Sequence, residues 1–161
     1  MVNLTHLDTA GNARMVDVGE KTISARSALA RGYLTLSPEA LAAVESRSLK
    51  KGDPISIAQL AGIMAAKKTS DLIPLCHPLP LSKVEVTGQL ADDQSQIEIT
   101  ASVSTTGQTG VEMEALTAVS VACLSLYDML KAIDKGLEIG PIHLVKKTGG
   151  KSGDFARPTS K

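Results

Sequence analysis

An aspartate and a lysine three positions apart are the clearest chemical pair in this sequence of 161 residues. Asp128 and Lys131 lie in an apolar run from Val111 to about Lys135, which predicts a long helix. At 100° per residue the two side chains fall on a polar stripe, while the rest of the circumference is nearly all apolar. Side chains three apart on a helix are neighbours. The pair is therefore either a structural ion pair or an acid and a base held in a closed pocket.

A second chemical feature is the proline-rich segment from Thr69 to Lys83, which holds one histidine, His77. Its three prolines exclude a helix and any central strand from the segment. The segment is nevertheless apolar, so we expect it to lie against the core with backbone groups that a bound ligand can satisfy. The alternative is a buried connector in which His77 is a satisfied core histidine.

Lys51 and the two cysteines are further candidates. Lys51 precedes Gly52 and a helix start, so it either contacts an anion or belongs to a solvated basic turn. Cys76 and Cys123 lie far apart in apolar surroundings, and we expect reduced core residues of a cytoplasmic protein. Cys76 is a poor candidate for a nucleophile beside His77, because neighbours in an extended segment point to opposite faces.

Composition excludes several classes of partner. The formal net charge is zero and aromatic residues make up 2% of the chain, which argues against a nucleic-acid surface. No signal peptide or membrane span is visible in the sequence. No cluster of His, Cys, Asp or Glu has the spacing of metal ligands.

The predicted elements follow the order strand, two helices, two strands, helix and strand. Their ranges are 22–36, 38–47, 54–68, 83–90, 96–104, 111–135 and 137–147, with a possible bulge at Gly32 in the first strand. The order predicts an α+β, ferredoxin-like βαββαβ sandwich with an extra helix in the first crossover. We expect an antiparallel sheet with its helices on one face. Residues 1–20 are predicted to form a flexible arm, 21–147 a single catalytic domain, and 148–161 a flexible Gly-rich tail.

Two runs of residues are specific enough to suggest a family. They are Pro74-Leu75-Cys76-His77-Pro78 and Gly110-Val111-Glu112-Met113-Glu114-Ala115-Leu116-Thr117. Shorter stretches from Met15-Val16-Asp17-Val18 to Gly149-Gly150-Lys151-Ser152-Gly153 extend the match over nearly the whole chain. On these residues the sequence resembles the cyclic pyranopterin monophosphate synthase family, also called molybdenum cofactor biosynthesis protein C.

The resemblance implies a lyase that converts a cyclised GTP, with ribose C3′ joined to guanine C8, into cyclic pyranopterin monophosphate and diphosphate. It implies a homohexamer, a trimer of dimers, with active sites between subunits. It assigns catalysis to Asp128, Lys131 and Lys51. It assigns substrate binding to Leu75, Cys76, His77, Glu112, Met113, Glu114 and Arg26, and it also points to Lys147.

The chemistry of these side chains agrees with that assignment. Arg26, Lys51 and Lys131 supply the cations that a polyphosphate leaving group needs. Asp128, Lys131 and His77 can transfer protons. We expect no cofactor on protein ligands, and any Mg²⁺ to be bound through the substrate phosphates. The competing hypothesis is a non-catalytic nucleotide-binding oligomer, which has no need of a carboxylate such as Asp128 facing an anionic ligand.

Overall fold

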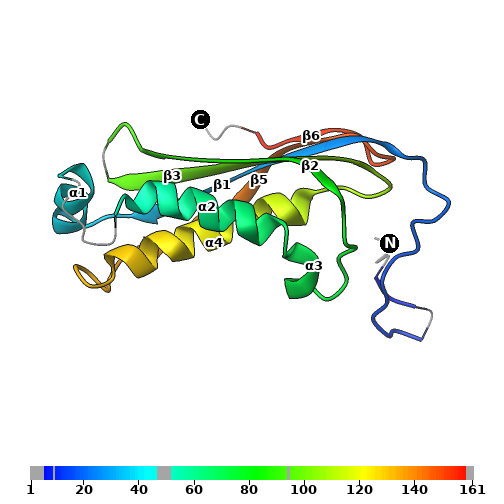
Figure 1. Cartoon of the computed structure of the whole chain (residues 1–161). Coiled ribbons are helices and arrows are strands. Elements are labelled where there is room, and N and C mark those ends of the chain that lie inside the picture. Colours follow the sequence, from blue (N-terminus) through cyan, green and yellow to red (C-terminus); the bar gives the residue numbers. More distant parts are fainter. Residues whose placement is uncertain (1–5, 9, 47–51, 94, 159–161) are drawn as a thin grey trace.

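The computed structural model describes residues 6–8, 10–46, 52–93 and 95–158, so Lys51 lies outside the described residues. Within these described residues, four helices and six strands follow one another. Figure 1 shows their arrangement. In chain order they are β1 (Ser24–Thr35), α1 (Pro38–Glu45), α2 (Pro54–Ala66), α3 (Thr69–Leu72), β2 (Leu81–Leu90), β3 (Gln96–Gly107), α4 (Glu112–Leu130), β4 (Glu138–Ile139), β5 (His143–Thr148) and β6 (Phe155–Ala156).

The strands form one antiparallel sheet in the order β2-β3-β1-β5-β6, and the short β4 pairs with β1. The four principal strands have the order of a ferredoxin-like sheet, β2-β3-β1-β5, with the crossover helices α2 and α4. Figure 1 shows these two helices side by side on the same face of the sheet. The predicted α+β fold is confirmed.

Local sequence signals set the starts of two helices. Ser37 caps α1 by accepting a hydrogen bond from the backbone N–H of Ala40, and Pro38 follows at the first helical position. Asp53 caps α2 in the same way, with its carboxylate 3.1 Å from the N–H of Ile55. Both helix starts agree with the prediction.

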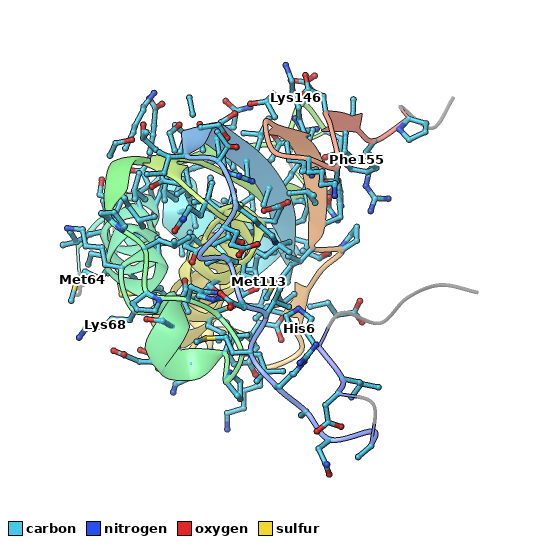
Figure 2. All side chains as sticks on the ribbon, turned by 90° about the vertical axis from the view of Figure 1, so that its right-hand side faces the viewer. His6, Met64, Lys68, Met113, Lys146 and Phe155 are labelled. Carbon is cyan, nitrogen blue, oxygen red and sulfur yellow. The ribbon has the colours of Figure 1, made fainter. Side chains whose placement is uncertain are left out.

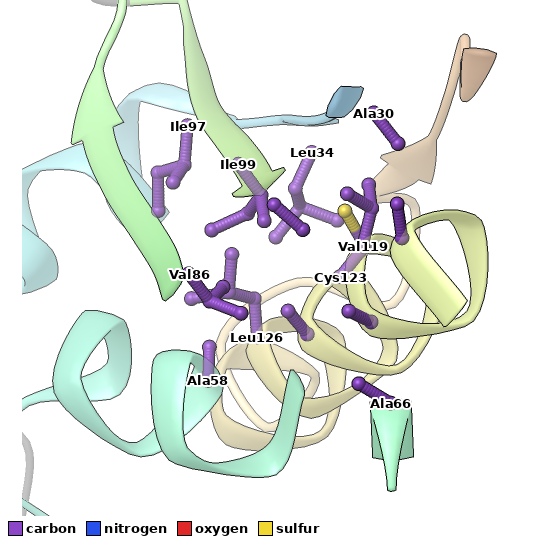
Figure 3. Packing of buried hydrophobic residues seen from close by; sticks show 14 of the residues in the cluster. Ala30, Leu34, Ala58, Ala66, Val86, Ile97, Ile99, Val119, Cys123 and Leu126 are labelled. Carbon is purple, nitrogen blue, oxygen red and sulfur yellow. The ribbon is translucent and has the colours of Figure 1, made fainter. Parts of the chain in front are cut away.

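The core lies between the sheet and the helix pair (Figure 3). Buried residues alternate along β1 and β3, so each strand turns one apolar side toward α4. Gly32 pairs in regular register with Ile99, and the irregularity of β1 falls between Leu29 and Ala30, opposite β5. The predicted bulge at Gly32 is therefore wrong. A Cβ at Gly32 would overlap with Val119 of α4, so the glycine allows the close packing of helix and sheet.

Three further predictions need correction. The segment from Thr69 begins with the short helix α3, because a proline restricts its own position and the one before it, and the first proline comes only at Pro74. Helix α4 ends at Leu130, and Lys131 is its C-cap. The last predicted strand is divided into β4 and β5 around the Gly140–Pro141 bond, which is cis.

The sheet also continues past residue 147. Strand β6 pairs with β5 through Lys146–Ala156 and Lys147–Phe155, so part of the predicted Gly-rich tail belongs to the sheet.

Among the described residues, α4 is the one helix long and apolar enough to cross a membrane by length and composition. It packs against α2, β1 and β3, and residues such as Ala118, Ala122 and Leu126 are fully buried there. Its apolar character is that of a core helix.

Candidate functional site

A cavity of about 320 Å³ at the N-terminal end of α4 gathers most of the predicted substrate-binding residues. We call it the His77 cavity. It is lined by Leu75, Cys76 and His77 from the proline-rich segment and by Glu112, Met113 and Glu114 from the first turn of α4. Two segments that are far apart in the sequence thus line one cavity.

The proline-rich segment is held in place by a few backbone groups. The N–H of Cys76 donates to the carbonyl of Ile73, and the buried hydroxyl of Thr105 donates to the carbonyl of Pro80 at 2.7 Å. Within the described part of the chain, His77 makes no hydrogen bond to protein, and its side chain is half-buried at the cavity. This placement favours a ligand contact over a satisfied core histidine.

A second cavity, of about 880 Å³, adjoins the first, and we call it the Arg26 cavity. The two share Lys21, Thr109, Gly110 and Glu112 as lining residues. The described basic residues that line the Arg26 cavity are Lys21, Arg26, Lys147 and Lys151, against the acidic Glu20 and Glu112. An excess of cations around an open cavity suits a polyanionic ligand.

Arg26 is positioned by the ends of two strands and by a glycine turn. Its Nε donates to the carbonyl of Gly107 at 2.9 Å. Gly150 has φ +83°, and a Cβ there would overlap with the Arg26 guanidinium. The turn after β5 therefore packs directly on this side chain, which only a residue without a Cβ allows.

Glu112 and Lys147 connect α4 to β5 inside the Arg26 cavity. Lys147 Nζ lies 3.7 Å from Glu112 Oε1, and it also donates to the hydroxyl of Ser152. The Glu112 carboxylate folds back over Gly110, where a Cβ would overlap with it. Both charged side chains are thus held at the cavity before any ligand binds.

Glu114 is the most buried acid of the site, with 4% of its surface exposed. Burial raises its pKa above the ordinary value, and the negative charge of Glu112 adds to the shift. Burial, and then the nearby Glu114, raise the pKa of the Cys76 thiol. Cys76 is therefore held as the thiol, which is the poorly nucleophilic form. Glu114 is better suited to proton transfer near neutral pH than an exposed carboxylate.

Asp128 and Lys131 form the predicted pair at the other end of α4. Lys131 Nζ lies 2.7 Å from Asp128 Oδ1, and the side chains are 51% and 58% exposed, respectively. The hydrogen bond and the charge of Asp128 raise the pKa of Lys131. Residues 112 and 128 are separated by roughly 24 Å along the axis at 1.5 Å rise per residue. One chain therefore does not bring this pair to the His77 cavity.

Comparison with known sequences gives the family. The profile of the MoaC family matches residues 15–150. The chain belongs to the MoaC family. Cyclic pyranopterin monophosphate synthase of Parvibaculum lavamentivorans is 58% identical over 152 residues, which cover 94% of this chain and 95% of that protein. The proteins of the same name from Chloroflexus aurantiacus and Thermomicrobium roseum are 56% and 55% identical, covering 96% and 98% of this chain and 95% of each relative.

The His77 cavity of this MoaC-family chain also has lining residues that the sequence did not single out. His6, Val16 and Val18 of the predicted arm line this cavity, and so does Lys21, which directly follows the arm. Figure 2 shows His6 of the arm on the same side of the molecule as Met113 of α4. The run Met15-Val16-Asp17-Val18, one of the stretches on which the resemblance rested, was the available signal.

Across the residues that the structure describes, no group of three or more His, Cys, Asp or Glu side chains is arranged to hold a metal ion.

Proposed function

We propose that this protein is a cyclic pyranopterin monophosphate synthase, as the relatives named above are. In this reaction the five-membered ring of the cyclised guanine opens and a pyranopterin forms. A hydroxyl oxygen of the sugar then bonds to the α-phosphorus, the bond from that phosphorus to the bridging oxygen breaks, and diphosphate leaves. The product belongs to molybdenum cofactor biosynthesis.

The observation that carries the proposal is the pairing of two adjoining cavities of different character. The Arg26 cavity offers cations such as Arg26 and Lys147 to a triphosphate. The His77 cavity offers His77 and the buried acid Glu114 to a base with several exchangeable protons. A purine triphosphate has both chemistries in one molecule, joined by a sugar.

We further propose that a second subunit completes each site, in a homohexamer built as a trimer of dimers. Asp128 and Lys131 lie too far along α4 to reach the His77 cavity of their own chain. In Figure 1, α2 begins at the same end of the molecule as the C-terminal end of α4, and Lys51 precedes α2 by three positions. A neighbouring chain that presents this end would add Asp128 and Lys131 to the cavity. For Lys51, which lies outside the described residues, we propose the same role from its sequence position before α2.

Apolar surface supports association. Ile57, Leu60 and Met64 recur at helical spacing on the exposed side of α2, with Leu60 and Met64 60% and 61% exposed. Leu124 of α4 is also exposed. Exposed leucine and methionine in one stripe are typical of surfaces that a partner covers.

Two minor parts of the proposal concern the setting of the reaction. Mg²⁺, where it takes part, is bound through the substrate phosphates and not by protein ligands. The enzyme acts in the cytoplasm, where its two cysteines stay reduced; Cys123 is buried, which raises its pKa to about 12.

The test uses purified protein and the cyclised GTP. Diphosphate release by the wild type, and its loss in Asp128→Ala and in Lys131→Ala, is the expected result. Diphosphate release that is unchanged in both variants would remove the catalytic role of the pair. Binding of the substrate with no release by the wild type would favour a non-catalytic nucleotide-binding protein.

A further inference from the structure

Gln108 connects the N-terminal arm to the loop between β3 and α4. Its side-chain amide donates to two carbonyls of the arm, that of Gly19 at 2.9 Å and that of Lys21 at 3.1 Å. Both N–H groups of the amide are used for this one purpose. Gln108 is also the only long side chain in the stretch Thr105–Gly110, whose other residues are threonine and glycine.

The arm segment that Gln108 holds is itself a tight turn. The N–H of Lys21 donates to the carbonyl of Val18 at 3.0 Å, and the N–H of Gly19 donates to the Asp17 carboxylate at 2.8 Å. The N–H and the carbonyl of Lys21 are therefore both hydrogen-bonded, and the position of its backbone is fixed on both sides.

Lys21 stands at the junction of the two cavities. It lines the Arg26 cavity and also the His77 cavity, and among the described lysines and arginines it is the one that lines both. Two other cations of the site have protein partners: Arg26 donates to Gly107, and Lys147 pairs with Glu112. Lys151 lines the Arg26 cavity but not the His77 cavity. Within the described part of the chain, the ammonium of Lys21 forms no ion pair.

From this placement we propose that Lys21 is a further substrate-binding residue and that Gln108 is its positioning residue. The Lys21 ammonium binds the phosphate chain where it passes from the Arg26 cavity toward the His77 cavity. Gln108 holds the arm so that the lysine remains at this junction. The identity of the ligand as a purine triphosphate rests on the proposed function; the cation and its anchor rest on the geometry.

The experiment measures binding and turnover separately. GTP serves as a purine triphosphate probe in calorimetric titrations, and the cyclised GTP serves for steady-state kinetics. Lys21→Ala is expected to raise both the Kd for GTP and KM about tenfold, as for one lost charge-assisted hydrogen bond. Because this contact holds substrate and transition state alike, kcat should change by less than about twofold. Lys21→Arg should restore most of the affinity.

Gln108→Ala is expected to shift Kd and KM in the same direction as Lys21→Ala. It should also speed trypsin cleavage at Arg14 and Lys21 while the thermal unfolding midpoint of the core stays near that of the wild type. The matched controls are Lys146→Ala, an exposed lysine of β5 that lines neither cavity and is labelled in Figure 2, and Gln89→Ala, an exposed glutamine of β2. Both controls should behave as the wild type.

Unchanged Kd and KM in Lys21→Ala would overturn the inference, even if the wild type releases diphosphate as proposed. Unchanged cleavage and affinity in Gln108→Ala would overturn the positioning role alone. If the wild type binds GTP through Lys21 but releases no diphosphate from the cyclised GTP, the proposed function is contradicted and the role of Lys21 in binding is supported.

Discussion

Lys131 Nζ lies 2.7 Å from Asp128 Oδ1 at the C-terminal end of α4, while Glu112, Met113 and Glu114 line the His77 cavity at the other end of the same helix. The predicted catalytic pair and three of the predicted substrate-binding residues thus lie at opposite ends of one helix. A helix of this length cannot bend its ends together. In an oligomer with sites between chains, each end of α4 would act with the opposite end of α4 in a neighbouring chain.

Two inactive variants should restore activity when they share an oligomer. Asp128→Ala and His77→Ala damage opposite ends of the chain, so a mixed oligomer contains some sites in which both intact ends meet. With random equal mixing, about a quarter of the sites should be complete if every site lies between two chains. Co-expression of the two variants, followed by a diphosphate release assay on the purified mixture, measures this fraction.

The control for that experiment is a mixture of Asp128→Ala and Lys131→Ala. Both substitutions damage the same end, so no chain in the mixture carries an intact pair and activity should stay at the level of the single variants. Sites confined to one chain would give no recovery in either mixture.

The Asp128–Lys131 pair should be visible in the titration of the lysine. The hydrogen bond raises the pKa of Lys131, so its contribution to stability is present below the ordinary value of 10.5 and is lost as pH rises through the raised pKa. Asp128→Asn removes the charge and should lower the midpoint of the Lys131 side-chain signal in an NMR titration. Asp71→Asn, which removes the partner of Lys68 instead, should leave that midpoint in place. A Lys131 midpoint that is equal in wild type and Asp128→Asn would contradict the pairing in solution.

We expect Glu114 to lower the free energy of unfolding at neutral pH. Burial raises its pKa, so above the ordinary value of 4.5 the unfolded chain releases its proton more readily and stability falls as pH rises. Glu114→Gln should therefore raise the free energy of unfolding at pH 7 and have a smaller effect near pH 4, where the folded state and most of the unfolded chains hold the proton. Urea unfolding at the two pH values tests this, with loss of turnover as the accompanying effect.

The comparison for Glu114 is Glu112→Gln. Glu112 is more exposed and pairs with Lys147, so its replacement removes a favourable interaction and should not stabilise the protein at pH 7. The same gain in both variants would mean that general acidic repulsion, not burial of Glu114, explains the effect.

Alanine substitutions at Gly150 and Gly153 distinguish the effect of backbone strain from the effect of the contact with Arg26. Both have positive φ, +83° and +71°, so alanine at either position should lower the free energy of unfolding by about 1–2 kcal/mol. A Cβ at Gly150 would also overlap with the Arg26 guanidinium, whereas nothing lies within 4 Å of a Cβ at Gly153. Gly150→Ala should thus weaken GTP binding in addition, and Gly153→Ala should not. Equal Kd values for the two variants would show that the Gly150 turn does not position Arg26.

Much of the fold follows from local signals. Ser37-Pro38 and Asp53-Pro54 mark helix starts because cap and proline geometry act within a few residues. Alternation of apolar and polar residues marks β3 for the same local reason, whereas the alternation in the sequence of β1 is imperfect. One error occurs where a long-range contact decides the local structure, at Gly32, whose missing side chain makes room for Val119 of α4.

In the candidate site too, some features follow from the sequence alone and others from the tertiary structure. The sequence by itself determined the chemical groups, the family-specific runs around His77 and Glu112, and the helical neighbourhood of Asp128 and Lys131, because all of these depend on residue type and short spacing. Only the tertiary structure decided that the Gln108 amide donates a hydrogen bond to the carbonyl of Lys21. It also decided that the first turn of α4 lines the His77 cavity while Asp128 and Lys131 lie at the far end of the helix. Contacts between positions 87 residues apart are set by how the sheet and helices pack, and no local pattern encodes that packing.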